Sequence, residues 1–438
     1  MKAKKKIFAV LSSAALFAGI MAGCSSNNDS ASGEKEEDSG QVTLTILVDN
    51  QTNLDGMKAV TDTIEEKYDI KTEYELRPGG GEGDNLVKTR LATGDMTDLM
   101  AYNSGSLFQA LNPEQNFLDI SEEPFVESIM DDAKDALSSN GKVYGIPSTS
   151  FMAGGWFYNK KIYEELGLSV PKTWDELMAN NEKIKEAGKT AVIGSYKDSW
   201  TAQVVVLADN YNVLQQHPTF AEDFTANKAK IAGTPGALRS FEKLAELFDA
   251  GYLNEDFLAT GYEAGLQKLA EGEGAHYPML SFALPMLSAN YAEELDNIGF
   301  FPQPGDSADE NGLTVWVPGG VYINKNTEHP EEAKKWMEFF VSQEGIDLYN
   351  EKIKPQGPPA VKGVELSDDV YGAVKDMIPF FESGKTAPAL EFLSPVKGPN
   401  LPQIAVEVGS GISDAKAGAE LYDKDVEKQA KQLGLEGW

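Results

Sequence analysis

The hydrophobic pattern of the first forty residues differs from that of the rest of the chain. Four lysines precede an apolar run over 7–21, which is shorter than the roughly 20 residues that span a bilayer. That order is typical of a cleaved signal peptide, here residues 1–23. Residues 24–40 contain no large apolar side chain, so they cannot bury a core and are expected to form a flexible tether.

From residue 41 onward, strand-like and helix-like patterns alternate. Apolar side chains occupy every second position over 42–48 and again over 70–76, which predicts two β-strands. Between them, Met57, Val60 and Ile64 share one face of a predicted helix. The run PGGGEG that follows, at 78–83, is expected to be a mobile loop. It is not a phosphate cradle, because the GxxxxGK[ST] motif is absent.

The stretch from 141 to 184 carries the most specific pattern in the chain. Two apolar runs, 144–147 and 151–158, lead into a short helix. Thr173 and Glu176 then form a capping box that starts another helix, since the threonine hydroxyl accepts from the Glu176 amide while the glutamate reaches back.

Four short motifs in this stretch carry a resemblance to a known family. They are YGIP at 144–147, YNK at 158–160, a Leu-Gly-Leu turn at 166–168 and VPKTWDEL at 170–177. In this order they resemble the extracellular solute-binding proteins of ABC importers, specifically the sugar-binding cluster known as family 1. The resemblance extends over nearly all of residues 41–433.

The resemblance implies an α/β protein with the two-lobe, type II periplasmic-binding-protein-like fold. Hinge strands join the lobes of such proteins, and the ligand binds in the cleft between them. The N-terminal lobe is expected to comprise 41–150 plus 299–326, and the C-terminal lobe 151–298 plus 327–438. The strand at 298–302 would then return the chain to the first lobe, and the helix from Pro330 would lie in the second.

Two candidate ligand contacts follow from the position of a strand. Asn50 and Gln51 come directly after the strand predicted at 42–48, and ligands of open α/β sheets bind outside the carboxyl ends of the strands. The alternative is that these two residues cap the helix that follows.

The other candidate ligand contacts are implied by the resemblance. The family's cleft-lining segments match Tyr102, Asn103, Ser148, Ser150, Asp198, Trp200, Phe282, Trp316 and Gly319. Phe282 stands where the family usually has tryptophan. A core position for Tyr102, and ordinary edge-strand polarity for the two serines, are the competing interpretations. Trp156 and His276 are expected to pack in the core.

The composition narrows the class of ligand. The formal net charge is −31, which disfavours nucleic acid and anionic lipid headgroups as partners. Only three arginines occur, Arg77, Arg90 and Arg239, and none falls in a candidate cleft stretch, which favours a neutral ligand. Abundant aromatic rings and uncharged polar groups suit the faces and hydroxyls of a sugar. With three histidines and one cysteine, no metal or cofactor is expected.

The one cysteine, Cys24, follows Met-Ala-Gly at the end of the signal peptide. This order resembles the lipobox of Gram-positive-type lipoproteins. The resemblance implies that Cys24 carries lipid, including palmitate, and holds the exported protein at the outer face of the cell membrane. Ordinary secretion is the alternative.

These patterns predict a monomeric substrate-binding lipoprotein that captures a neutral sugar, specifically an oligosaccharide. Its partners would be the sugar, an ABC permease and, through the lipid anchor, the membrane. No bond in the ligand would be broken. One competing class is a secreted carbohydrate-active enzyme, for which no GxSxG, HExxH or Walker motif is present. Another is a lipoprotein that uses this fold in sensing or adhesion.

Overall fold

The computed structural model describes residues 40–438. The expected signal peptide (1–23), the lipidation site Cys24 and most of the tether therefore lie outside the described residues. Residues 41–438 form one unit, in which no helix is long and apolar enough to cross a membrane.

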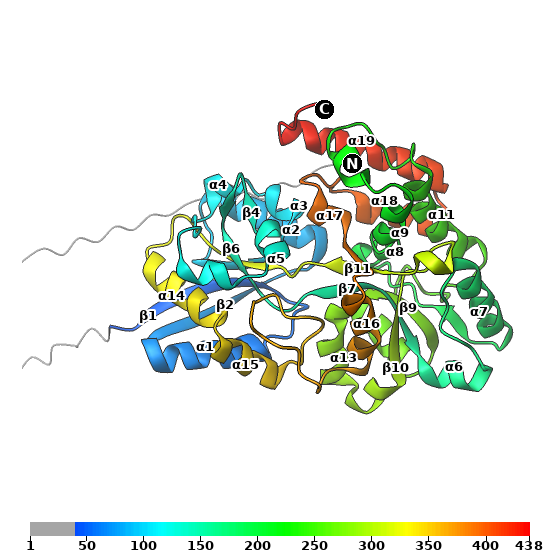
Figure 1. Ribbon diagram of the computed structural model, residues 1–438, viewed down its shortest axis with the longest axis horizontal. Coiled ribbons are helices and arrows are strands. Elements are labelled where there is room, and N and C mark those ends of the chain that lie inside the picture. The colour runs from blue at the N-terminus through cyan, green and yellow to red at the C-terminus, as the bar shows by residue number, and fades with distance from the viewer. Residues whose placement is uncertain (1–39) are drawn as a thin grey trace, which may run out of the picture. The chain divides into compact units, whose positions relative to one another are not determined.

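The first lobe is built on a five-stranded sheet, on the left in Figure 1. Its strand order is β2 (Ile70–Arg77), β1 (Val42–Asp49), β3 (Leu99–Tyr102), β12 (Gly320–Ile323) and β6 (Gly145–Pro147). β1 runs parallel to β2 and β3, whereas β12 is antiparallel to both β3 and β6. Both predicted strands near the start of the chain are confirmed.

Helices cover both faces of this sheet. On one face, Ile46, Val60, Ile64 and Trp336 belong to a single core cluster. That face is covered by α1 (Asp55–Tyr68), α14 (Pro330–Phe340) and α15 (Gln343–Lys352). The other face is covered by α2 (Gly80–Thr93) and α3 (Ser106–Gln109), with Phe108 stacked on Tyr322 at 4.5 Å between ring centres. The expectation that the helix from Pro330 lies in the second lobe is wrong, because Trp336 packs in the first core.

The glycine-rich run at 78–83 is helical from Gly80 onward and is not a loop throughout. Gly79 is the N-cap of α2, and the helix begins at Gly80. A Cβ on Gly83 would lie 2.0 Å from the Pro78 carbonyl oxygen and 2.6 Å from Nη1 of Arg77. Close approach of the helix to the strand before it accounts for the glycine there.

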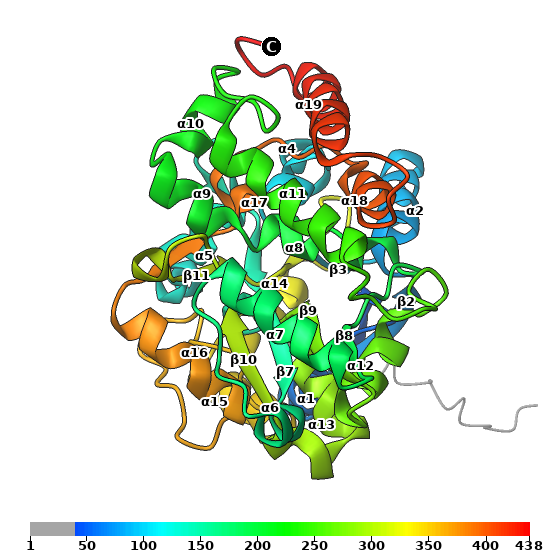
Figure 2. The ribbon, with the colours of Figure 1, turned by 90° about the vertical axis from the view of Figure 1, so that its right-hand side faces the viewer.

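The second lobe is built on a six-stranded sheet, which faces the viewer in Figure 2. Its centre is β7 (Met152–Asn159), which contains most of the apolar run at 151–158 and is flanked by β9 (Gly274–Leu280) and then β8 (Thr190–Val192). On its other side β7 pairs along its length with two strands in turn, β10 (Ile298–Pro302) and β11 (Leu313–Trp316). β13 (Thr386–Pro388) pairs with β11 at the edge.

The place where the chain returns to the first lobe therefore differs from the expectation. β10 was expected to make that return, but Phe300 and Phe301 pair with the second-lobe strand β7. β11 also pairs with β7, and only β12 joins the first sheet. The return falls between Trp316 and Gly320. An isolated strand pattern does not say which of two sheets accepts the strand.

Helices of the second lobe cover both faces of its sheet. The capping box at the start of α7 (Trp174–Glu186) is half confirmed: the Glu176 amide donates to the Thr173 hydroxyl at 3.2 Å, but the Glu176 carboxylate accepts from the Lys172 amide rather than from Thr173. The helices include α6 (Lys160–Leu166), α7 (Trp174–Glu186), α8 (Val204–Leu207), α9 (Asn210–Gln216), α10 (Phe220–Thr225), α11 (Pro235–Asp249), α12 (Tyr262–Ala270), α13 (Leu284–Asn290), α16 (Gly372–Glu382), α17 (Leu390–Leu393), α18 (Leu401–Gly409) and α19 (Ala415–Gln432).

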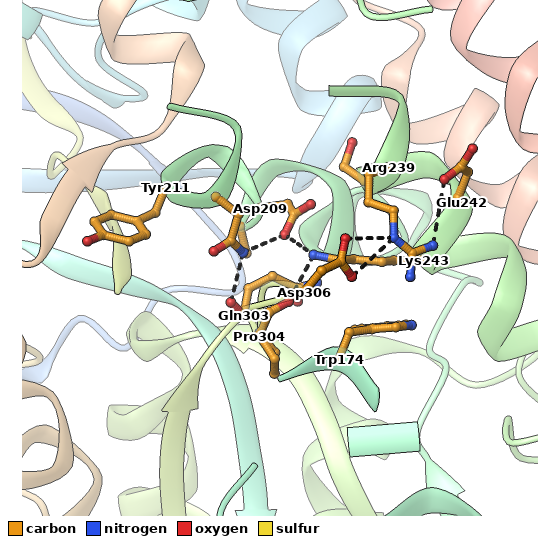
Figure 3. A network of polar contacts seen from close by, with 12 residues as sticks. Trp174, Asp209, Tyr211, Arg239, Glu242, Lys243, Gln303, Pro304 and Asp306 are labelled. Atoms are coloured by element: carbon orange, nitrogen blue, oxygen red, sulfur yellow. Dashed lines mark hydrogen bonds and ion pairs between the residues drawn. The ribbon is translucent and has the colours of Figure 1, made fainter. Parts of the chain in front are cut away.

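A buried ion pair fixes the loop after β10 to two of these helices (Figure 3). The Lys243 ammonium lies 2.6 Å from the Asp209 carboxylate, each side chain is 1% exposed, and Lys243 also donates to the Pro304 carbonyl. The side-chain amide of Asn212 donates to Asp209 and to the Gln303 carbonyl. Because an unpaired charge here would be costly, the pair holds α9, α11 and the loop together.

Trp156 and His276 pack in the core as predicted, both at 0% exposure. The His276 ring lies between the Tyr163 hydroxyl, 2.7 Å from Nε2, and the Asn181 side-chain oxygen, 2.8 Å from Nδ1. An amide oxygen only accepts, so Nδ1 carries the proton and Nε2 accepts from the tyrosine. Burial lowers the pKa of His276 to about 3, so the ring is neutral in the native protein.

We predict that His276→Gln flattens the loss of stability in acid. Below about pH 6.5 an unfolded histidine binds a proton that native His276 refuses until about pH 3, so wild-type stability falls through that window. This linkage amounts to up to ~1.4 kcal/mol per pH unit. Urea unfolding at pH 7 and pH 4.5 should give a smaller difference for the variant, even if its stability at pH 7 is lower. Equal differences would contradict this account.

Candidate ligand-binding site

Three chain segments cross between the two sheets, and hydrogen bonds link them. The Ser148 amide and hydroxyl both donate to the Gly319 carbonyl, at 2.9 and 3.0 Å. The Ser150 hydroxyl accepts from the Gln356 amide at 3.1 Å, and the Phe151 amide donates to the Pro358 carbonyl. Both predicted serines thus lie at the crossing, where their hydroxyls bond to backbone groups of the neighbouring segments.

A cavity of about 50 Å³ lies beside these crossing segments and is bordered by Ser148, Tyr349 and Pro355. It has room for a few water molecules, and it is too small for a sugar ring. This cavity is therefore not the candidate ligand site, which lies where residues of the two lobes meet.

The first-lobe side of the site is the carboxyl edge of β1 and β2. Asp49 and Arg77 end these two strands and form an ion pair, with 3.2 Å between Arg77 Nη1 and an Asp49 carboxylate oxygen. Asn50 is exposed. Gln51 is half-buried, and its backbone amide donates to the Asp49 carboxylate. They do not cap α1, because its N-cap is Leu54.

Arg77 lies beside the candidate residues, a position that the sequence pattern did not predict. Its guanidinium is 5% exposed and lies over the Tyr102 ring, 5.3 Å from the centroid. One arginine therefore does lie beside the candidate residues, although its charge is paired with Asp49. Asp49 and Arg77 each end a strand. The rule that ligands bind at the carboxyl ends of strands therefore applies to them as well as to Asn50.

The end of β3 brings further candidates to the same region. Tyr102 is 4% exposed and packs in a core cluster with Val87 and Phe108, while its hydroxyl donates to Asp84 at 2.7 Å. Asn103 is exposed. A Cβ on Gly319 would lie 2.8 Å from the Tyr102 carbonyl, so the close approach of the return segment to β3 requires glycine.

The second-lobe side of the site is a cluster of three aromatic rings, Trp200, Tyr262 and Phe282. The Trp200 ring lies 5.3 Å from that of Tyr262 and 5.7 Å from that of Phe282, and the last two are stacked at 5.4 Å. Trp200 and Phe282 are half-buried. The predicted residue Asp198 supports this aromatic cluster, because its carboxylate accepts from the Tyr262 amide at the start of α12. Tyr262 was missed, since only the fold brings it beside Trp200.

The two sides of the site touch at two places. A Cβ on Gly80, in the first turn of α2, would lie 3.3 Å from Cδ1 of Trp200. A Cβ on Gly105 would lie 2.4 Å from the Glu391 carbonyl oxygen and 2.8 Å from the Phe392 ring. The aromatic cluster therefore contacts the first lobe close to the Asp49–Arg77 edge.

Trp316 is packed inside the second lobe in this conformation. It is 6% exposed, and its indole N–H donates to the Glu391 carboxylate at 2.9 Å. Glu391 is in turn paired with Lys397. A Cβ on Gly154 would lie 2.1 Å from the indole, so the ring packs directly against β7.

The described residues contain no group of three or more His, Cys, Asp and Glu side chains placed to hold a metal ion. The candidate site consists of a cluster of aromatic rings on the second lobe that meets the polar strand ends of the first lobe. The segments that cross between the two sheets connect these two sides. Two α/β lobes that meet around such a site define the class of two-lobe solute-binding proteins.

The chain belongs to the bacterial extracellular solute-binding protein family, whose model matches residues 49–346. The expected family and its two-lobe fold are thereby confirmed.

Individual relatives support this family. The multiple sugar-binding protein of Streptococcus mutans is 26% identical over 376 residues, which cover 83% of this chain and 84% of the relative. A chitin oligosaccharide binding protein of known structure has a TM-score of 0.78 at 22% identity, covering 89% of this chain and 99% of that one. The solute-binding protein RafE in complex with raffinose has a TM-score of 0.70 at 20% identity, covering 90% and 100%.

We predict that Gly154→Ala destabilises the protein, because its methyl group would lie 2.1 Å from the Trp316 indole. Overpacking of this kind costs about 1–3 kcal/mol of unfolding free energy. Gly81→Ala, in the first turn of α2 with no atom within 4 Å, is the control and should leave stability unchanged or slightly raised. Thermal unfolding compares the three proteins. A Gly154→Ala protein as stable as wild type would show that the indole does not rest on β7.

Proposed function

We propose that this protein captures a neutral oligosaccharide between its two lobes and delivers it to the membrane permease of an ABC transporter. The observation that carries the proposal is the aromatic cluster of Trp200, Tyr262 and Phe282, set against the polar edge of the first lobe. Aromatic faces bury the apolar faces of sugar rings, and polar side chains pair with their hydroxyls. Sugars named for the relatives, including raffinose and chitin oligosaccharides, fit the same chemistry.

The charges around the site favour an uncharged ligand. Arg77 is paired with Asp49, and Asp84 and Asp198 add carboxylates on the two sides. An acidic sugar would meet this surplus of negative charge without a free guanidinium to pair with it. Binding without bond cleavage is the role that follows for a member of this family.

We propose a lobe division that follows the sheets and cores. The first lobe would comprise 41–147 plus 320–361, and the second 152–316 plus 370–438. The segments between them would act as the hinge, and rotation about them would open and close the site.

Attachment of the protein to the membrane through its N-terminal segment is proposed from the sequence alone. Cys24, outside the described residues, would carry the lipid anchor that holds a monomeric receptor at the outer face of the cell membrane. The polar tether up to residue 40 would then let the folded unit reach the permease.

We predict that Trp200→Ala weakens sugar binding. Loss of a stacking ring should cost ~1–3 kcal/mol, or roughly 5- to 150-fold in Kd. Isothermal titration with raffinose, maltotriose and chitotriose measures it. Trp438→Ala is the matched control, because Trp438 packs on Phe224 and donates to the Thr225 carbonyl, away from the site. Binding of none of these sugars by wild type, or equal affinity in both variants, would refute the proposed site.

We also predict that Cys24→Ser releases the protein from the membrane. A serine has no thiol to take the lipid, so the variant should appear in the medium of expressing cells and should not incorporate labelled palmitate. Fractionation with an antibody to the folded part measures its distribution. A variant that still sediments with membranes would argue for a different means of attachment.

A further inference from the structure

The hydroxyl of Tyr262 is the least expected polar group of the aromatic cluster. Its side chain is 1% exposed, and the hydroxyl has no hydrogen-bond partner among residues 40–438. The ring is held between Trp200 and Phe282, and the backbone amide is held by Asp198. A buried hydroxyl without a partner is costly, so its presence here calls for a function that phenylalanine would not serve.

The first lobe presents unsatisfied groups at the same contact. Nη1 of Arg77 pairs with Asp49 and donates to the Pro78 carbonyl. Its Nε is buried without a partner among the described residues. Burial raises the pKa of Tyr262 well above its usual value. The negative charges of Tyr277 and Glu263 when ionised, and that of Asp49 across the lobe boundary, add to the shift. The geometry places these groups at one contact: Gly80, three residues after Arg77, meets Trp200, whose ring lies 5.3 Å from that of Tyr262.

We propose that Tyr262 on one lobe and the Asp49–Arg77 pair on the other are specificity-determining groups that bind the same sugar hydroxyl. The inference rests on the proposed function and names the recognition chemistry of that site. A sugar hydroxyl has one hydrogen to donate and two lone pairs to accept with. It donates to the Asp49 carboxylate and accepts from Arg77 Nε and from the Tyr262 hydroxyl. Its full capacity is then used by groups drawn from both lobes.

This arrangement selects against two classes of analogue. A deoxy sugar leaves the Tyr262 hydroxyl and Arg77 Nε unpaired, which is the condition that gives hydrogen-bonding sites their discrimination. A carboxylate at the same position cannot donate to Asp49 and meets its charge at close range. A neutral sugar with a free hydroxyl at this position is therefore the preferred ligand.

The test compares Tyr262→Phe with Tyr277→Phe. Tyr277 is also fully buried in the second lobe, but its hydroxyl is paired with Ser195 at 2.7 Å and donates more weakly, at 3.4 Å, to the backbone carbonyl of Tyr262. Without sugar, Tyr262→Phe should melt at or above the wild-type temperature, whereas Tyr277→Phe should melt lower. A clear fall for Tyr262→Phe would show that its hydroxyl has a protein partner, and would overturn the inference.

Titration with raffinose, maltotriose and chitotriose supplies the second measurement. For the sugars that wild type binds, Tyr262→Phe should weaken binding on the order of tenfold, with Tyr277→Phe close to wild type. Monodeoxy derivatives of the bound sugar should include one for which wild type and Tyr262→Phe bind equally. Equal affinity for the parent sugar overturns this inference alone, and binding of no sugar by wild type overturns the proposed function with it.

Discussion

The geometry of the whole molecule depends on how closely the crossing segments approach one another. The Gly319 carbonyl accepts from both the amide and the hydroxyl of Ser148, and Gly319 itself lies against the Tyr102 carbonyl, where no Cβ fits. These contacts bring the end of β6, the start of β12 and the end of β3 to the same point. The two sheets are thereby joined by short, mutually bonded strands rather than by a flexible linker. The crossing segments are therefore held to one another where the chain passes between the lobes.

The two sides of the site are built in different ways, and this suits their roles. On the first lobe, polar groups at the strand ends are held by each other, as in the pairing of Arg77 with Asp49. On the second lobe, rings hold one another, and a single carboxylate, Asp198, fixes the start of the helix that carries Tyr262. Stacking tolerates small shifts of a sugar ring, whereas directional hydrogen bonds do not. At the proposed site, one lobe would therefore supply contact area and the other most of the orientation.

Local patterns predicted the elements well and their partners poorly. The strand at 42–48 and the capped helix after Thr173 depend on neighbours in sequence, and the structure has both. The destination of β10 and of the helix from Pro330 depends on which sheet accepts them, and both expectations were wrong. The glycines at 79–81 suggested a loop, but a helix can begin without a side-chain cap where a tryptophan from the other lobe lies against its first turn. Tyr262 and Arg77 entered the site only through the fold.

The Lys243–Asp209 pair has a consequence for how the second lobe assembles after export. Its two charges come from different helices, and the Pro304 carbonyl that shares the ammonium comes from a third segment. Any intermediate that buries one charge before the other arrives is penalised by the cost of removing it from water. Assembly of these three segments is therefore coupled, because the buried charges are paired only when all three are in place.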